Sequence, residues 1–284
     1  ERRLLLDEFR LDEHTLNSAL DPDELSRLEF EPEHTALIYK QPKNYTATDQ
    51  LVFKVLSVGI FLFAERIVIV SAGEVPLFEG KLFNRVGSLP ELLLKLVFRS
   101  VYHFLDHLKV ITMITDELER KLVTSMDNQH LLNLFSLEKS LVYYLNAINS
   151  NSALVERLKF NTAKLGFTRE LVEILEDIGI ENSQCYRQAE IHSNILAGLM
   201  DARASIVNNN LNTIMKRLTV ISIVFMPLNM LAGIGGMSEF SMMTKNVPWP
   251  VSYGLFGVGL GLIGMLTYFL IRNMGSGGKR SRGR

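Results

Sequence analysis

A row of polar and sulfur-containing side chains near the carboxyl end of this 284-residue chain has the spacing of one helical face. Its members follow one another at steps of three, four or seven residues, and one α-helical turn takes 3.6 residues. They are Asp201, Ser205, Asn208, Asn212, Met215, Ser222, Met226 and Asn229. Carboxylate, amide and hydroxyl oxygens bind hard cations, and because Mg²⁺ gives up its water reluctantly, amide and hydroxyl groups would hold a hydrated ion through its waters.

The same helical face is predicted to pass from water into a bilayer. Residues 218–238 and 251–271 contain no charged side chain, and each run has about the 20 residues that span a bilayer core. One such run is compatible with the core helix of a soluble protein, but two at the end of one chain favour membrane insertion. As far as Arg217, the pattern is explained equally well by a helix whose polar side faces solvent. This explanation ends there, because the charge-free run begins at residue 218. Beyond Arg217, we expect several copies to surround an axis, with rings of oxygen atoms separated by apolar constrictions.

The charges around the two spans predict their orientation. Lys216 and Arg217 precede the first span, and five basic residues follow the second, namely Arg272, Lys279, Arg280, Arg282 and Arg284. The excess of basic residues on cytoplasmic flanks therefore predicts a multi-pass protein of the cell (inner) membrane with both termini cytoplasmic. The connection 239–250 would be external, with Trp249 at the membrane interface. Glycines at positions 254, 257, 259, 261 and 264 predict that the second span packs closely against a neighbouring helix.

The first 166 residues have the pattern of an α/β domain. Residues 37–39 and 51–70 are β-like, with a break near positions 64–66, so we expect a small sheet there. Helical periodicity follows over about 92–118 and 130–148, and from 167 it continues for about 70 residues into the first span. We therefore expect an α/β cytoplasmic domain over 1–166, a stalk helix over 167–217, membrane helices over 218–238 and 251–272, an external loop over 239–250 and a basic cytoplasmic tail over 273–284.

Composition narrows the function. The formal net charge is -1, so no nucleic-acid partner is expected. The single Cys185 excludes an internal disulfide framework. We find no phosphate-binding glycine loop and no convergent spacing of nucleophile and base, so an enzyme is the least favoured class. The expected partners are the lipid bilayer, divalent cations and further copies of the chain, with no cofactor other than a transported or regulatory cation.

Three short motifs point to a family. Residues 212–219 (Asn-Thr-Ile-Met-Lys-Arg-Leu-Thr), 225–228 (Phe-Met-Pro-Leu) and 232–234 (Ala-Gly-Ile) resemble the first membrane segment of the CorA family of divalent-cation transporters. The resemblance is strong over roughly residues 195–272 and architectural before that. It implies a funnel-shaped homopentamer, with a cytoplasmic α/β domain, a long stalk helix and two membrane helices joined by a short external loop.

The outer end of the first span departs from the family pattern. Where the family has Gly-Met-Asn, this chain has Gly236, Met237 and Ser238, followed by Glu239. The resemblance implies that these four residues form the selectivity entrance. Because a serine hydroxyl is shorter than an asparagine amide and lacks its carbonyl, tight selection of hydrated Mg²⁺ is not expected at Ser238.

The resemblance also implies roles for individual residues. Asn212 and Met215 would line the inner pore, Leu218 and Met226 would narrow it, and Asn229 would be a polar pore residue. The full expected pore lining is Asn208, Asn212, Met215, Leu218, Ser222, Met226, Asn229 and Gly233. Asp201 stands where the family has a stalk carboxylate that binds regulatory Mg²⁺.

Three functions remain open from the sequence. The first is a channel or transporter that carries Mg²⁺ or related divalent cations through a central homopentameric pore. The second is a Zn²⁺ transporter, with or without coupling to protons, although the polar face offers zinc no nitrogen ligand and no sulfur other than methionine. The third is a membrane-anchored oligomeric sensor that does not conduct.

Overall fold

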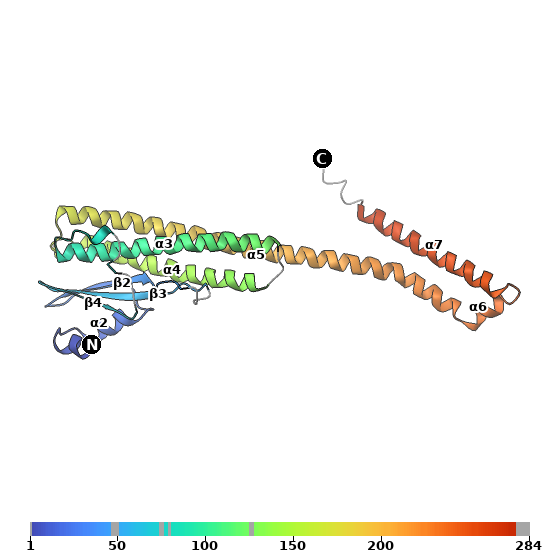
Figure 1. Ribbon diagram of the computed structural model, residues 1–284, viewed down its shortest axis with the longest axis horizontal. Helices are drawn as coiled ribbons and strands as arrows, with labels where there is room; N and C mark the ends of the chain where they lie inside the picture. The colour runs from blue at the N-terminus through green and yellow to red at the C-terminus, as the bar shows by residue number, and fades with distance from the viewer. Residues whose placement is uncertain (1, 47–50, 74–76, 79–80, 125–127, 277–284) are drawn as a thin grey trace. The chain divides into compact units, whose positions relative to one another are not determined.

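The computed structural model describes residues 2–46, 51–73, 77–78, 81–124 and 128–276 (Figure 1). It separates into two compact units, Glu1–Arg203 and Ala204–Arg284. Most of the predicted basic tail, from residue 277 onward, lies outside the described residues. One helix, α5, has residues in both units and runs over Arg169–Gly235, 67 residues in all.

The first unit is built on a four-stranded antiparallel sheet in the order β1-β2-β3-β4. The strands are β1 (Arg27–Phe30), β2 (Thr35–Pro42), β3 (Val55–Leu62) and β4 (Ile67–Ser71). The expected sheet is therefore present, and the 51–70 stretch breaks into two strands near positions 64–66, where Phe63 N–H donates to the carbonyl of Arg66 at 2.9 Å. The sequence did not predict β1, because four residues that alternate charged and apolar side chains give too short a signal.

Helices cover both faces of this sheet (Figure 1). The short helix α1 (Arg2–Asp7) precedes α2 (Glu13–Leu20), which packs on one face of the sheet, whereas α3 (Leu89–Thr124) and α4 (Asn128–Phe160) pack on the other. A 3-10 turn, η2 (Lys81–Phe83), leads into α3. Both long helices extend beyond the predicted ranges. On α4 the apolar positions continue to contact the main core as far as Leu158, whereas α3 continues past its last buried core residue, Leu118, to Thr124.

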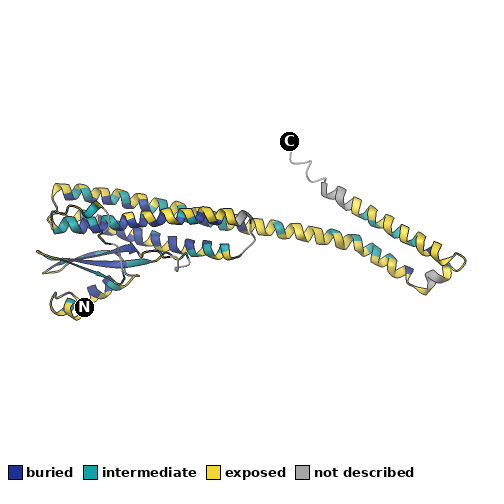
Figure 2. Cartoon of the chain, in the orientation of Figure 1, coloured by how far each residue is buried: buried dark blue, intermediate teal, exposed yellow. Residues whose placement is uncertain are grey.

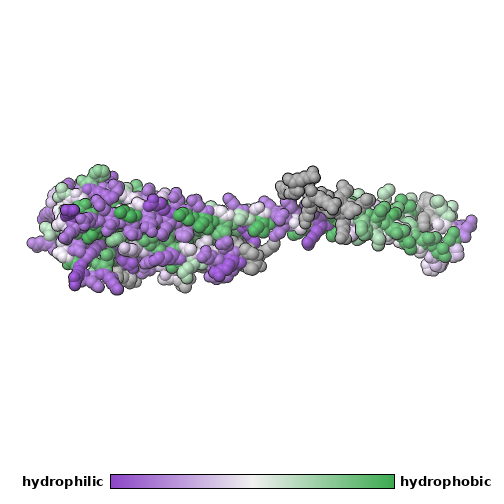
Figure 3. All heavy atoms as spheres, turned by 90° about the horizontal axis from the view of Figure 1, so that it is seen from above, coloured by the Kyte–Doolittle hydropathy of each residue, from purple (hydrophilic) through white to green (hydrophobic). Residues whose placement is uncertain are grey.

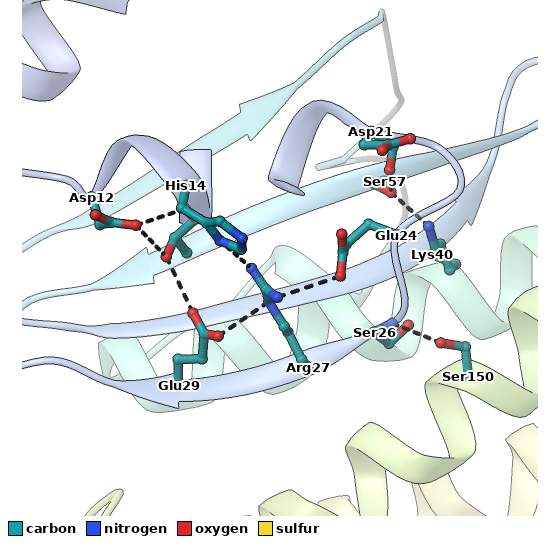
Figure 4. A network of polar contacts seen from close by, with 11 residues as sticks. Asp12, His14, Asp21, Glu24, Ser26, Arg27, Glu29, Lys40, Ser57 and Ser150 are labelled. Atoms are coloured by element: carbon teal, nitrogen blue, oxygen red, sulfur yellow. Dashed lines mark hydrogen bonds and ion pairs between the residues drawn. The ribbon is translucent and has the colours of Figure 1, made fainter. Parts of the chain in front are cut away.

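A polar network joins α2 to the sheet (Figure 4). Asp12 caps α2 by accepting from Thr15 N–H at 3.0 Å, and this bond lowers the pKa of the Asp12 carboxyl. Thr15 also donates to Glu29 on β1 at 3.2 Å. Arg27 lies between the carboxylates of Glu29 and Glu24, each at 3.3 Å. Since the charged groups of this network are at most partly buried, its ion pairs position α2 more than they stabilise the fold.

Beyond Ile38, the edge of β2 that faces β1 is held by α4, while the other edge of β2 pairs with β3 along the whole strand. β1 pairs with β2 only as far as Ile38. Two residues further along, Asn151 of α4 accepts from Lys40 N–H and donates to the Lys40 carbonyl, both at 2.8 Å, and it also accepts from the Ser26 hydroxyl at 2.9 Å. The Asn151 amide thus replaces a strand partner at a fully enclosed point of the sheet.

The side chain of Lys40 is itself buried between the sheet and the loop after α2 (Figure 4). Its ammonium group donates to the carbonyl of Pro22 at 2.7 Å and to the hydroxyl of Ser57 at 2.8 Å. Burial lowers the pKa of Lys40, while the nearby carboxylates of Asp21, Asp23 and Glu24 act in the opposite direction. Hydrogen bonds and acidic neighbours together explain how a lysine is tolerated there.

The first part of α5 packs on α3 and α4. Asn182 donates to the carbonyl of Ile148 at 3.1 Å and to the hydroxyl of Ser152 at 2.7 Å, both on α4. His192 is within 3.1 Å of the Thr112 hydroxyl on α3. Cys185 is buried between them as a free thiol. These contacts fix which face of α5 is turned inward within this unit.

The second unit contains the end of α5, a short helix α6 (Ser238–Met243) and α7 (Trp249–Ser276). Stretches of α5 and α7 are long and apolar enough to cross a membrane, within Arg169–Gly235 and Trp249–Phe269. The first of these helices ends at Gly235, three residues before the predicted end at 238, because the following Gly-Met pair leaves helical geometry. α6 begins at Ser238, the last residue predicted for the first membrane helix, and continues into the segment 239–250 that was expected to be a loop.

The Asn151 contacts give a stability prediction. Asn151→Ala leaves the N–H and the carbonyl of buried Lys40 without the amide, so we expect the free energy of unfolding to fall by about 2–4 kcal/mol. The change is measured by denaturant unfolding of the full chain in detergent. Asn149→Ala, at an exposed position two residues earlier on α4, is the control and should change it by less than about 0.5 kcal/mol. If both variants lower the free energy of unfolding equally, the hydrogen bonds between Asn151 and Lys40 do not have this stabilising role.

Candidate ion-conduction site

The predicted polar face is fully exposed along the part of α5 in the second unit (Figure 2). The exposed residues include Asn208, Asn212, Met215, Leu218, Ser222, Met226, Asn229 and Gly233. Met226 is 74% exposed although it lies in the middle of an apolar run. Within the described chain, therefore, these side chains are not covered by other elements.

The opposite side of α5 is the one that packs against α7. Val224, Leu228 and Leu231 are partly buried and Gly235 is fully buried. At about 100° per residue, their mean direction is about 160° from that of Ser222, Met226, Asn229 and Gly233. Figure 2 shows the partly buried positions as interruptions in an otherwise exposed helix. The chain thus covers one side of its first membrane helix and leaves the polar side open.

Two close contacts set the packing of α5 on α7. A Cβ placed on Gly235 would lie 2.6 Å from the ring of Phe256, and one on Gly264 would lie 3.3 Å from Leu228. From the first contact to the second, the position on α5 moves back by seven residues, from Gly235 to Leu228. The position on α7 moves forward by eight, from Phe256 to Gly264, so the two helices run antiparallel. Of the five glycines predicted to pack in the second span, only Gly264 meets another helix within the described chain. Cβ atoms at the other four would meet nothing within 4 Å.

Asn229 lies at the edge of the polar face. It borders a groove of about 410 Å³ whose other wall is α7, including Gly261, Gly264 and Met265. Pro227 is two residues earlier, and because proline has no N–H, the carbonyl of Ile223 lacks its usual helical donor. Asn229 and the Ile223 carbonyl are therefore two polar groups at this depth of the span.

The predicted selectivity entrance forms the turn between α5 and α6. Gly236 N–H donates to the carbonyls of Ala232 and Gly233, both at 3.2 Å, and Met237 N–H donates to that of Ile234 at 3.1 Å. Ser238 begins α6. Gly236, Met237 and Ser238 are exposed, whereas the side chain of Glu239 lies outside the part that the structure describes. The hydroxyl of Ser238 is thus placed by a tight helix-to-helix turn.

Asp201 is exposed near the end of the first unit. Its neighbour Arg203 is buried on the same helix. Among the described residues, no three histidine, cysteine or carboxylate side chains are grouped so that they could hold a metal ion. The structure therefore places Asp201 on the surface of one chain without adding a second ligand from that chain.

A buried histidine pair in the first unit was not singled out from the sequence. His103 and His107, one turn apart on α3, have ring centroids 4.5 Å apart. The Nδ1 of His103 lies 3.4 Å from the amide nitrogen of Gln41, and that of His107 lies 2.6 Å from the hydroxyl of Tyr144. Burial lowers the pKa of both histidines from 6.5 to about 4. The pair belongs to the hydrogen-bonded core between sheet and helices.

This pair makes stability depend on pH. The unfolded chain binds protons on these histidines below pH 6.5 and the folded chain only near pH 4, so the stability present above 6.5 is lost as pH falls through this window. We expect the midpoint of denaturant unfolding to be constant from pH 7 to 8 and to decrease from 6.5 toward 4. His107→Gln keeps a partner for Tyr144 but cannot be protonated, and it should reduce the slope by about half. If the variant keeps the slope of the native chain, groups other than His107 cause the loss of stability between pH 6.5 and 4.

Comparisons with known proteins agree with this architecture. A family model described as CorA-like Mg²⁺ transporter protein matches residues 1–272. The cobalt/magnesium transport protein CorA of Methanocaldococcus jannaschii is 24% identical over 249 residues, which cover 82% of this chain and 74% of that protein. The corresponding protein of Thermotoga maritima is 28% identical over 167 residues, or 58% of this chain and 47% of that one.

Solved structures share the fold. The complete structure of the CorA magnesium transporter from Methanocaldococcus jannaschii matches with a TM-score of 0.80 at 22% identity, over 94% of this chain and 85% of that one. The full-length CmaX protein matches with a TM-score of 0.69 at 16% identity, over 96% and 84% of the two chains.

A sheet covered by helices, one long helix that ends in an apolar segment, and a second apolar helix define a membrane protein of the divalent metal-ion transport class. The chain belongs to the CorA family. Members of this family are transporters of divalent cations and not enzymes, so the fold class and the family expected from the membrane motifs are confirmed.

Proposed function

We propose that copies of this chain assemble as a homopentamer with the polar face of α5 around a central pore that conducts Mg²⁺ or related divalent cations. The observation that carries the proposal is the division of α5, whose apolar side packs on α7 while its polar side is uncovered. In a bilayer, polar groups avoid lipid and face a partner or water. Assembly around an axis provides both.

The chemistry of the face suits a hydrated cation. One chain contributes a single side chain at each level, so a ring of ligands requires several copies. Rings of Asn212 and Ser222 would offer amide and hydroxyl oxygens, while rings of Met215, Leu218 and Met226 would form narrower, less polar levels that gate by dewetting. Inward movement of a divalent ion across 100 mV, negative inside, is favoured by about 4.6 kcal/mol, so the gradient itself can drive uptake.

The proposal also assigns the two ends of the pore. Gly236, Met237, Ser238 and Glu239 would form the outer entrance, where the serine hydroxyl predicts broader selection among divalent cations than an asparagine ring. Both termini would be cytoplasmic, as Lys216 and Arg217 before the first span indicate. Asp201 would bind a regulatory cation between neighbouring copies. The Zn²⁺ alternative gains no support from the polar face, because oxygen groups and thioethers are not the ligands zinc prefers.

Conduction is tested in liposomes that contain the full chain and a Mg²⁺-sensitive dye. Asn212→Leu and Asn229→Leu would replace amide rings by apolar ones, so each should lower the initial rate of Mg²⁺ uptake on the order of ten-fold. Asn210→Leu is the matched control, because Asn210 lies about 160° around the helix from both Asn208 and Asn212 and therefore off the polar face. Uptake at the protein-free rate by the native chain, with Mg²⁺ or Zn²⁺, would refute the transport proposal and favour a non-conducting sensor.

Regulation by Asp201 is tested through proteolysis. If Mg²⁺ on Asp201 holds copies together, adding Mg²⁺ should slow tryptic cleavage of the native chain, and Asp201→Ala should remove most of this protection because the site loses its charge. Asp177→Ala changes another exposed carboxylate of α5 and should retain the protection. Full protection of Asp201→Ala would exclude this residue from regulation.

A further inference from the structure

A second groove of the membrane unit lies between the end of α5 and the first turns of α7. It encloses about 500 Å³. Leu231 of α5 and Val247 of the connection form one side, and Phe256, Gly259 and Ile263 of α7 form the other. Its α7 residues recur at three- and four-residue steps, so they share one helical face. Figure 3 shows largely hydrophobic residues along the membrane unit on the face drawn, with more polar residues at its tip.

One end of the groove contains a polar atom that has no partner among the described residues. Ser252 is only 8% exposed, and its hydroxyl makes no hydrogen bond there. A helical serine usually donates to the carbonyl four residues earlier. Here that carbonyl, of Pro248, already accepts from Val251 N–H at 3.0 Å and from Ser252 N–H at 3.1 Å. A buried hydroxyl without a hydrogen bond is energetically unfavourable. We therefore expect the groove to bind a molecule that places a hydrogen-bond acceptor beside Ser252.

The length of the groove corresponds to one leaflet. From Ser252 to Ile263 there are eleven residues, or about 16 Å along the helix axis. This is about half of the roughly 30 Å hydrocarbon core. Ser252 lies three residues after Trp249, which is 75% exposed at the start of the apolar helix, where indole rings favour the headgroup level. The hydroxyl is therefore at the depth of the ester groups of a phospholipid, and the apolar remainder extends toward the bilayer centre.

The volume distinguishes a lipid chain from a protein helix. A helix segment of 16 Å length and 10 Å diameter occupies about 1,250 Å³, more than twice the space of the groove. Its backbone carbonyls are also already paired, so it would bring no main-chain acceptor to Ser252. A single acyl chain is thinner, and its ester carbonyl is an acceptor attached to an apolar tail.

We infer that this groove is a phospholipid site, in which one acyl chain of the leaflet on the α6 side lies along α7 and its ester carbonyl accepts a hydrogen bond from Ser252. Bound lipid then fills the space between the two membrane helices near the Gly235–Phe256 contact. This inference rests on the membrane helices and their packing, and not on conduction.

The test counts lipids on the assembled full chain. Protein purified in detergent and stripped of lipid is titrated with dioleoylphosphatidylglycerol, and bound molecules are counted by native mass spectrometry. We expect about one tightly bound lipid per chain. Ser252→Ala should weaken binding about five-fold, the size of one hydrogen bond. Gly259→Leu should abolish it, because a Cβ there points into open space of the groove.

Gly257→Leu is the matched control, since it adds the same side chain to α7 at an open position outside the groove and should bind lipid as the native chain does. Size-exclusion chromatography and circular dichroism establish that each variant assembles. Should Gly259→Leu fail to assemble, an affinity of Ser252→Ala within two-fold of the native value overturns the inference. The inference is also overturned if the native chain retains no lipid and the Ser252→Cys variant forms disulfides between copies. In that case the groove would hold a second copy of the chain.

Discussion

The constraint on which this structure depends is that the hydrocarbon core of a bilayer offers no hydrogen-bond partners to polar groups. The long helix α5 carries amides and hydroxyls on one side as far as Asn229, well inside its apolar segment. The packing of α7 on the other side means that the chain does not hide these groups by itself. In the proposed assembly, association around the polar side would remove these groups from lipid and would create a polar axis through the membrane.

The first unit also encloses polar groups, but it pairs them within the chain. Its sheet and helices enclose several polar groups, and those between the sheet and α3 and α4 have specific partners. Asn151 completes the hydrogen bonding of β2 at Lys40, and Gln41 and Tyr144 bind the histidine pair. Since a buried donor or acceptor without a partner destabilises a fold, these bonds specify one arrangement of sheet and helices. Asn182 extends the same principle to the start of α5.

The membrane unit combines close packing with open space. Gly235 and Gly264 allow α5 and α7 to approach, whereas Gly259 and Gly261 border grooves and meet no other atoms within 4 Å of a Cβ. In a soluble protein such grooves would fill with water or collapse. In a bilayer, lipid chains or neighbouring helices fill such spaces, so the glycine-rich face of α7 determines what packs beside α5.

The sequence by itself determined the features that repeat over many residues. The two apolar runs, the long helix and its polar face follow from composition and period, and the motifs at 212–219 and 225–228 were sufficient to indicate the family. The α/β class of the first unit and strands β2 to β4 were also predictable, because alternating or β-branched runs bounded by breaks are local signals.

Only the tertiary structure decided which side of α5 is covered. The identity of the side chains at Leu228 and Gly235 does not reveal that they meet Gly264 and Phe256, since those partners are 21 to 36 positions away and a period describes only a single helix. The same applies to β1, to the exchange between Asn151 and Lys40, and to the unpaired hydroxyl of Ser252. Each depends on two segments that chain folding brings together, and residue type and local spacing carry no information about that distance.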